Sequence, residues 1–121
     1  MTTIPQNPAT EMFRASDVLD VDGWVAYLTP DVSFRFGNAD PISGRDTVRQ
    51  AVSEFFATIK GLKHTIVQEW LIDDVNIQKL DVTYTRLDDK VVTIPAANIL
   101  RVEDGLIADY QIYADLTPVY A

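Results

Sequence analysis

The stretch from Lys63 to Tyr113 decides the fold, and its four β-rich runs read KHTIVQEWLI (63–72), IQKLDVTYTRL (77–87), VVTIPAANILRV (91–102) and LIADYQIY (106–113). Each run is rich in β-branched and aromatic residues, which is typical of strands. The runs are separated by Asp73-Asp74, Asp88-Asp89 and Glu103-Asp104-Gly105, short polar segments that are typical of hairpin turns. The sequence therefore predicts four consecutive antiparallel strands.

The residues before these runs predict three helices and one more strand. Apolar residues within 9–19 recur at three- and four-residue spacings, so a first amphipathic helix is expected to end near Asp20. A second short helix is expected over 23–28, with Asp20 and Asp22 as capping carboxylates and Thr29-Pro30 as its stop. The strand follows over 32–36.

The third helix is predicted over 45–60, where Ser43 and Asp46 resemble a capping box. Helices early in the chain and strands late in it indicate an α+β domain, with the helices covering one face of a mainly antiparallel sheet.

Length and composition indicate a single globular domain. The chain has 121 residues, of which 47% are hydrophobic and 23% charged, so a core is expected over residues 9–121, after a flexible arm over 1–8. A net charge of −8 argues against a nucleic-acid partner. No apolar run is long enough to span a membrane, and the absence of a signal-like start favours the cytoplasm.

The composition gives no indication of a metal site or of a cofactor. The chain has no cysteine and one histidine, which excludes thiolate chemistry and a multi-histidine metal site, and no cofactor or metal is expected.

Strand alternation sorts the side chains into two faces. The more apolar face is expected to meet the helices, and it comprises Phe34, Phe36, His64, Ile66, Gln68, Trp70, Val82, Tyr84, Ile94, Ala96, Asn98, Leu100, Tyr110 and Ile112. An apolar wall with a few converging polar groups is the usual form of a small-molecule site, although a plain core with satisfied polar edges gives the same pattern.

Four sequence pieces resemble the nuclear-transport-factor-2-like superfamily, which includes the polyketide-cyclase (SnoaL-like), ketosteroid isomerase, scytalone dehydratase and limonene epoxide hydrolase families. They are DVDGW at 20–24, LTPDVSF at 28–34, SGRD at 43–46 and NILRVEDGLIADYQIY at 98–113. The resemblance implies a cone-shaped domain, in which a curved, mostly antiparallel sheet wraps around three N-terminal helices. It does not fix the function, because this fold carries enzymes, binding modules and transport factors.

Carrying over the families' site residues removes two mechanisms. Ketosteroid isomerases have a general-base Asp where Phe36 stands, an oxyanion Asp where Asn98 stands and a Tyr where Met12 stands. Limonene epoxide hydrolases hold water with a Tyr and an Asn at Phe34 and Phe36, and with an Asp at Ile112. Their Arg-x-Asp motif matches Arg86-Leu87-Asp88 in letters, but this match falls in a predicted hairpin.

One pair survives the comparison with scytalone dehydratase and some bile-acid dehydratases. In these enzymes an Asp late in the first helix orients a His at the start of the second strand, and Asp17 and His64 occupy similar positions here. A carboxylate that accepts Nδ1–H leaves Nε2 as the base, which suits elimination or isomerisation next to a carbonyl. The plain alternative is an exposed Asp17 near a helix end and a His64 at the solvent edge.

The resulting prediction is a cofactor-independent dehydratase, isomerase or cyclase of a hydrophobic, carbonyl-bearing small molecule, with Asp17 and His64 as catalytic residues. The residues expected to line the substrate site, some of them as oxyanion donors, are Asn98, Tyr84, Tyr110, Trp70, Phe34, Phe36, Ile112, Tyr27 and Met12. The alternative is a non-catalytic small-molecule-binding or interaction domain of the same fold.

The opposite sheet face predicts self-association. It is half apolar, comprising Thr65, Val67, Glu69, Leu71, Thr83, Thr85, Ala97, Ile99, Ile107 and Tyr113, with Lys79, Asp81, Arg101 and Asp109 among them. Because the helices already occupy the other face, a homodimer packed sheet to sheet is expected to cover this one.

Overall fold

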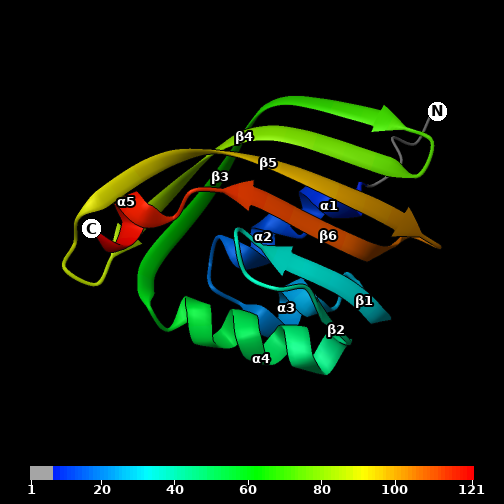
Figure 1. The fold of residues 1–121 in the computed structure, drawn as a ribbon, viewed down its shortest axis with the longest axis horizontal. Coiled ribbons are helices and arrows are strands. Elements are labelled where there is room, and N and C mark those ends of the chain that lie inside the picture. The colour runs from blue at the N-terminus through cyan, green and yellow to red at the C-terminus, as the bar shows by residue number, and fades with distance from the viewer. Residues whose placement is uncertain (1–6) are drawn as a thin grey trace.

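The computed structural model describes residues 7–121, and it has the predicted α+β architecture (Figure 1). The helices are α1 (Pro8–Glu11), α2 (Phe13–Ser16), α3 (Val21–Val25), α4 (Arg45–Phe56) and α5 (Thr117–Tyr120). The strands are β1 (Leu28–Phe36), β2 (Ile42–Ser43), β3 (Ile59–Ile72), β4 (Val75–Arg86), β5 (Val91–Glu103) and β6 (Leu106–Ala114).

The strands form one curved, unclosed sheet in the order β2-β1-β6-β5-β4-β3. All neighbouring strands are antiparallel except β1 and β6, which run parallel. Figure 1 shows α2, α3 and α4 on the side toward which the sheet curves. This arrangement places the site between the helices and the inner face of the sheet.

The N-terminal helices are shorter than predicted. The first predicted helix is divided at Met12 into α1 and α2, and the predicted arm lies mostly in residues 1–6, outside the described residues. The Asp20 carboxylate caps α3 as expected, since it accepts from Gly23 N–H (3.0 Å). However, α3 ends at Val25, and the predicted stop at Thr29-Pro30 is wrong because both residues already belong to β1.

The predicted capping box of the long helix is also wrong. Gly44 is the N-cap of α4, with a φ of 95° and no side-chain cap, while Ser43 belongs to the short strand β2. A positive φ is easily reached by glycine, which lets the chain turn from β2 into α4 within one residue. The helix ends at Phe56, because the chain is drawn into β3 from Ile59 onward, four residues before the predicted strand start.

A β-bulge in β3 reverses the faces predicted for its second half. Ile66 pairs with Leu80 but Gln68 pairs with Lys79, so one extra residue is inserted in β3. Beyond this point Trp70 lies on the outer face with its partner Ile77, and Glu69 shares the inner face with Gln78. The predicted inner positions of Gln68 and Trp70 are therefore wrong, as are the outer positions of Glu69 and Leu71.

A second shift, between β5 and β6, corrects the position of Ile107. Arg101 pairs with Asp109 but Val102 pairs with Ile107, which turns Ile107 from the predicted outer face into the core. Ile107 is fully buried, and its N–H donates to the Tyr27 carbonyl (2.7 Å). The core is otherwise the predicted one, formed by the inner face of the sheet and the apolar faces of the helices.

Candidate functional site

A partly open, mainly apolar cavity lies between the sheet and the helices. Its free volume is about 50 Å³. The lining residues are mostly aromatic and aliphatic, and they are Ser16, Trp24, Phe34, Phe36, Val52, Phe55, Phe56, Leu62, His64, Val82, Tyr84, Ala96, Asn98, Tyr110, Ile112 and Ala114. The few polar groups among them make this the default candidate for a small-molecule site.

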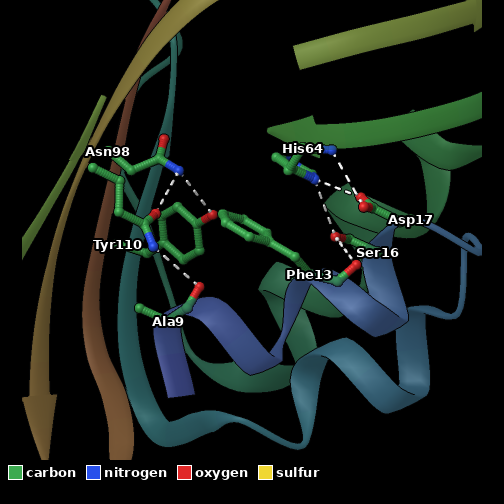
Figure 2. A network of polar contacts seen from close by, with 8 residues as sticks. Ala9, Phe13, Ser16, Asp17, His64, Asn98 and Tyr110 are labelled. Atoms are coloured by element: carbon green, nitrogen blue, oxygen red, sulfur yellow. Dashed lines mark hydrogen bonds and ion pairs between the residues drawn. The ribbon is translucent and has the colours of Figure 1, made fainter. Parts of the chain in front are cut away.

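Asp17 and His64 are in direct contact at the edge of this cavity (Figure 2). Asp17 follows α2 and His64 lies in β3, so the pair joins the helices to the sheet. The Asp17 Oδ1 atom is 2.6 Å from His64 Nδ1, and Asp17 Oδ2 accepts from the His64 backbone N–H at 3.2 Å. The two side chains are 28% and 13% exposed, so the carboxylate keeps contact with water while the imidazole is largely enclosed.

The surroundings of His64 leave Nε2 as the accessible ring nitrogen. Ser16 Oγ lies 3.5 Å from Nδ1, on the same nitrogen as Asp17, and its hydroxyl donates to the Phe13 carbonyl at 3.2 Å. The three residues are therefore not a nucleophilic Ser-His-Asp triad, which needs Ser and Asp on opposite ring nitrogens. Within residues 7–121 Nε2 has no hydrogen-bond partner.

The Phe13 ring fixes the plane of the imidazole. Its centroid is 4.1 Å from that of His64 and the two rings are 7° from parallel. Phe13 is itself buried, so the stack holds one face of the histidine against the core. The histidine ring is thus oriented by one charged contact and one aromatic contact.

On the side of the site opposite His64, Figure 2 shows Ala9, Asn98 and Tyr110, which a series of side-chain hydrogen bonds connects. Gln78 Nε2 donates to the Ala9 carbonyl (3.3 Å), and Asn98 Nδ2 donates to Gln78 Oε1 (3.2 Å) and to the Tyr110 hydroxyl oxygen (3.4 Å). Gln78, Asn98 and Tyr110 are all at most 2% exposed. Buried polar groups of this kind are stable only when they are hydrogen-bonded to one another.

The two tyrosines of the cavity stay protonated. Burial raises the pKa of Tyr84, and the nearby Tyr120 raises it further. Burial also raises the pKa of Tyr110, with smaller contributions from Tyr84 and from the negative charge of Asp17. Both phenols are therefore neutral hydrogen-bond donors at physiological pH rather than bases.

The structure brings most of the predicted site residues together. Asn98, Tyr84, Tyr110, Phe34, Phe36, Ile112 and His64 line the cavity, and Asp17 reaches it through His64. Three residues that were predicted to line the cavity lie elsewhere. Met12 is fully buried in the core, Tyr27 packs against the core, and Trp70 lies on the outer face.

The Arg-x-Asp match is a surface feature, as its hairpin position predicted. Arg86 ends β4, and it contacts the exposed Asp88 in the following turn at 3.1 Å. Neither residue lines the cavity.

Sequence reasoning missed three residues around the site: Phe13, Ser16 and Gln78. The alternation of β4 carried a signal for Gln78, since it lies two and four residues before the inward-facing Leu80 and Val82. Phe13 and Ser16 were assigned only to a helix, because the sequence does not show where α2 meets β3.

Metal-ligand clusters and membrane-spanning helices are both absent from residues 7–121. That part of the chain contains no group of three His, Cys, Asp or Glu side chains placed to hold a metal ion. None of its helices is both long and apolar enough to cross a bilayer.

Solved structures with the same fold have low sequence identity to this chain. A ketosteroid isomerase-like protein from Catenulispora acidiphila, in complex with trimethylamine, has a TM-score of 0.83 at 17% identity, covering 95% of this chain and 89% of its own. An NTF2-like protein of unknown function from Burkholderia pseudomallei has a TM-score of 0.82 at 16% identity, with coverages of 93% and 91%. An LEH-like epoxide hydrolase from M. tuberculosis has a TM-score of 0.79 at 15% identity, with coverages of 93% and 84%.

The family assignment comes from sequence. No curated protein matches the chain. The family model of the SnoaL-like domain matches residues 9–110, which is most of the sequence. The chain therefore belongs to the SnoaL-like domain family.

Proposed function

We propose that this protein is a lyase or isomerase that needs no cofactor and acts on a small, largely hydrophobic molecule with a carbonyl group. The observation that carries the proposal is the 2.6 Å contact between Asp17 Oδ1 and His64 Nδ1 beside an apolar cavity. The SnoaL-like family and the epoxide hydrolase among the similar structures agree with conversion of small molecules on this fold.

His64 acts as the base and Asp17 orients it. With Nδ1–H donated to Asp17, the lone pair lies on Nε2, and the carboxylate stabilises the imidazolium that forms. Nε2 removes the proton next to the substrate carbonyl, and the electrons of the broken C–H bond form an enolate. In an elimination the enolate expels a β-hydroxyl group, which takes the proton from Nε2 and leaves as water. In an isomerisation the same proton returns to another carbon.

The cavity limits the substrate. Its free volume of about 50 Å³ is smaller than a cavity of about 150 Å³ that holds benzene in an engineered protein. Small substrates are favoured, and larger ones require Phe55 and Phe56 of the lining to move. A complex with trimethylamine in a solved relative is an example of a small ligand on this fold.

Deuterium incorporation tests the proposal without a known substrate. Small ketones such as cyclopentanone are incubated in D₂O with the protein, and exchange of their α-protons is followed by NMR. The wild type and the exposed-site control Asp40→Ala are expected to accelerate exchange, and His64→Gln is expected to abolish the acceleration. Exchange that is equally fast with His64→Gln would remove His64 from the mechanism.

A second candidate function is a non-catalytic binding domain. It is favoured by Phe34, Phe36 and Ile112, which form an apolar wall where the enzymes that the sequence resembles carry a tyrosine, an acid or an amide. Tight binding of several apolar ligands in thermal-shift assays, without any turnover that depends on His64, would support it over the enzyme.

We also propose a homodimer through the outer face of the sheet. Val67, Trp70, Ile99 and Tyr113 on β3, β5 and β6 are between 40% and 56% exposed, which is a large apolar area for a monomer. Light scattering tests this assembly. A mass near 13.6 kDa that does not change with concentration would refute it.

A further inference from the structure

The hydrogen bonds that lead to Tyr110 have a fixed direction, and a backbone carbonyl sets it. The Ala9 carbonyl has no proton, so Gln78 must present Nε2 to it (3.3 Å) and turn Oε1 toward Asn98. In a continuous helix the Phe13 N–H would donate to this carbonyl. That bond is absent from the described residues because the helix is divided at Met12. The helix break thus creates the acceptor that orients Gln78.

The orientation of Gln78 dictates that of Asn98. Gln78 Oε1 can only accept, so Asn98 turns Nδ2 toward it (3.2 Å), and the same amide donates to the Tyr110 oxygen (3.4 Å). Both protons of Asn98 are then engaged. Asn98 Oδ1 is left buried with no partner within residues 7–121.

The unpaired Oδ1 of Asn98 shows that the contact with Gln78, rather than the contact with Tyr110, determines the orientation of the Asn98 amide. Turning the Asn98 amide over would let Oδ1 accept from the Tyr110 hydroxyl, but it would also place Oδ1 against Gln78 Oε1. The observed orientation leaves one buried acceptor unpaired, whereas the turned orientation would place two acceptor oxygens against each other.

Tyr110 is left with a free proton at the cavity. Its oxygen accepts from Asn98, and its own O–H has no acceptor among the described residues. Ring contacts with Trp24 (5.9 Å between centroids) and Phe34 (5.6 Å) hold the phenol in place. Tyr110 and His64 line the same cavity, so a ligand bound there can contact both side chains.

We infer that Gln78 is a positioning residue, which directs these hydrogen bonds so that Tyr110 rather than Asn98 donates to the oxygen of the substrate carbonyl. This role rests on the proposed lyase or isomerase activity. A neutral phenol stabilises the oxygen as it gains charge in the enolate, in the manner of an oxyanion hole. The raised pKa of Tyr110 agrees with this role because the proton stays on the phenol.

The test uses the protein without ligand or turnover, so its outcome is independent of the proposed activity. Gln78→Met and Gln78→Glu are compared with the wild type, and Gln68→Met on the outer face is the matched control. The readouts are the ¹³Cζ shift of Tyr110, assigned with Tyr110→Phe, and the exchange rates of the Asn98 side-chain amide protons.

The two Gln78 variants are expected to differ in the direction of the Asn98 amide, which the Tyr110 signal and the Asn98 amide exchange rates report together. Methionine has no oxygen and only a weakly accepting sulfur, so the Asn98 amide turns, the Tyr110 O–H donates to Asn98 Oδ1, and the ¹³Cζ signal moves. The Asn98 amide protons then exchange roughly tenfold faster, the factor for one hydrogen bond of about 1.4 kcal/mol. Glutamate keeps an accepting oxygen in either protonation state, so the Tyr110 signal stays near that of the wild type.

A role in packing alone leaves the direction of the Asn98 amide unchanged, so the Asn98 amide protons of folded Gln78→Met would keep their wild-type exchange rates. An unmoved Tyr110 signal in folded Gln78→Met, or a larger change in Gln78→Glu, would overturn the inference. The wild type gives a test that needs no variant. Both Asn98 amide protons must be protected from exchange, and one fast-exchanging proton would contradict the network.

Discussion

Replacing Asp17 with alanine removes the charged side of the candidate acid–base pair, and its effect follows from two contacts. The carboxylate accepts from the His64 ring nitrogen at 2.6 Å and from the His64 backbone N–H at 3.2 Å. It is 28% exposed, so water weakens these contacts without abolishing them. Alanine leaves the backbone N–H and the ring nitrogen of a largely enclosed residue without this partner.

The expected loss is about 2–3 kcal/mol. Both hydrogen bonds are made to a charged group, for which one bond contributes about 1.5–3 kcal/mol, and partial exposure to water reduces the pair to about the value of one such bond. For a domain of this length, 1 kcal/mol shifts the unfolding temperature by about 4 °C. Asp17→Ala should therefore lower the midpoint by about 8–12 °C.

Thermal unfolding followed by circular dichroism measures this shift. Asp17→Asn keeps an accepting oxygen and should lose about half as much stability, and Asp40→Ala on the surface should change the midpoint little. The deuterium incorporation described above should fall with Asp17→Ala and persist with Asp40→Ala. If Asp17→Ala lowers the midpoint no more than Asp40→Ala does, Asp17 does not bind His64 in solution and the acid–base pair is refuted.

Three further predictions concern the core, acid stability and the buried phenols. Leu100→Ala removes a fully buried side chain and should cost about 2–5 kcal/mol in urea unfolding; a loss below 1 kcal/mol would place Leu100 outside the core. The Arg49 guanidinium, 2.7 Å from Asp22, lowers the pKa of that carboxyl, so Asp22→Asn should destabilise the protein at neutral pH. The difference in unfolding free energy between the wild type and Asp22→Asn should vanish as the pH falls below the ordinary pKa of 3.8 and through the lowered pKa. A difference that grows as the pH falls would contradict this prediction. Because the pKa values of Tyr84 and Tyr110 are raised, replacing either with Phe should leave the absorbance change at 295 nm near pH 10 unaltered; a smaller change would show that the phenol ionises normally.

The order of elements was predictable because it depends on local patterns. The four alternating runs from Lys63 to Tyr113 became β3 to β6, and the turns between them lie at the predicted acidic pairs, where Asp73 and Asp89 adopt a positive φ. Alternation fixes the face of a side chain only while the register holds. The bulge after Ile66 and the shift before Val102 depend on how strands pair, so the faces of Trp70 and Ile107 were mispredicted.

Contacts between distant elements explain what the sequence could and could not indicate about the site. Asp17 and His64 were found through a resemblance to known dehydratases, and the structure places them in contact. Gln78 was missed, although the alternation of β4 places it on the inner face. Its role depends on a hydrogen bond to the Ala9 carbonyl, which lies 69 residues away in the sequence.

The sequence by itself determined the α+β class, the antiparallel strands and the apolar inner face, because these follow from the periodicity of neighbouring residues. Only the tertiary structure decided which polar groups converge on the cavity and in which direction they donate. Hydrogen-bond direction depends on partners that are far apart in the chain, and a backbone carbonyl such as that of Ala9 has no signature in the sequence. The break of the first helix at Met12 leaves the Ala9 carbonyl to Gln78, and the register of β4 with β5 places Gln78 opposite Asn98.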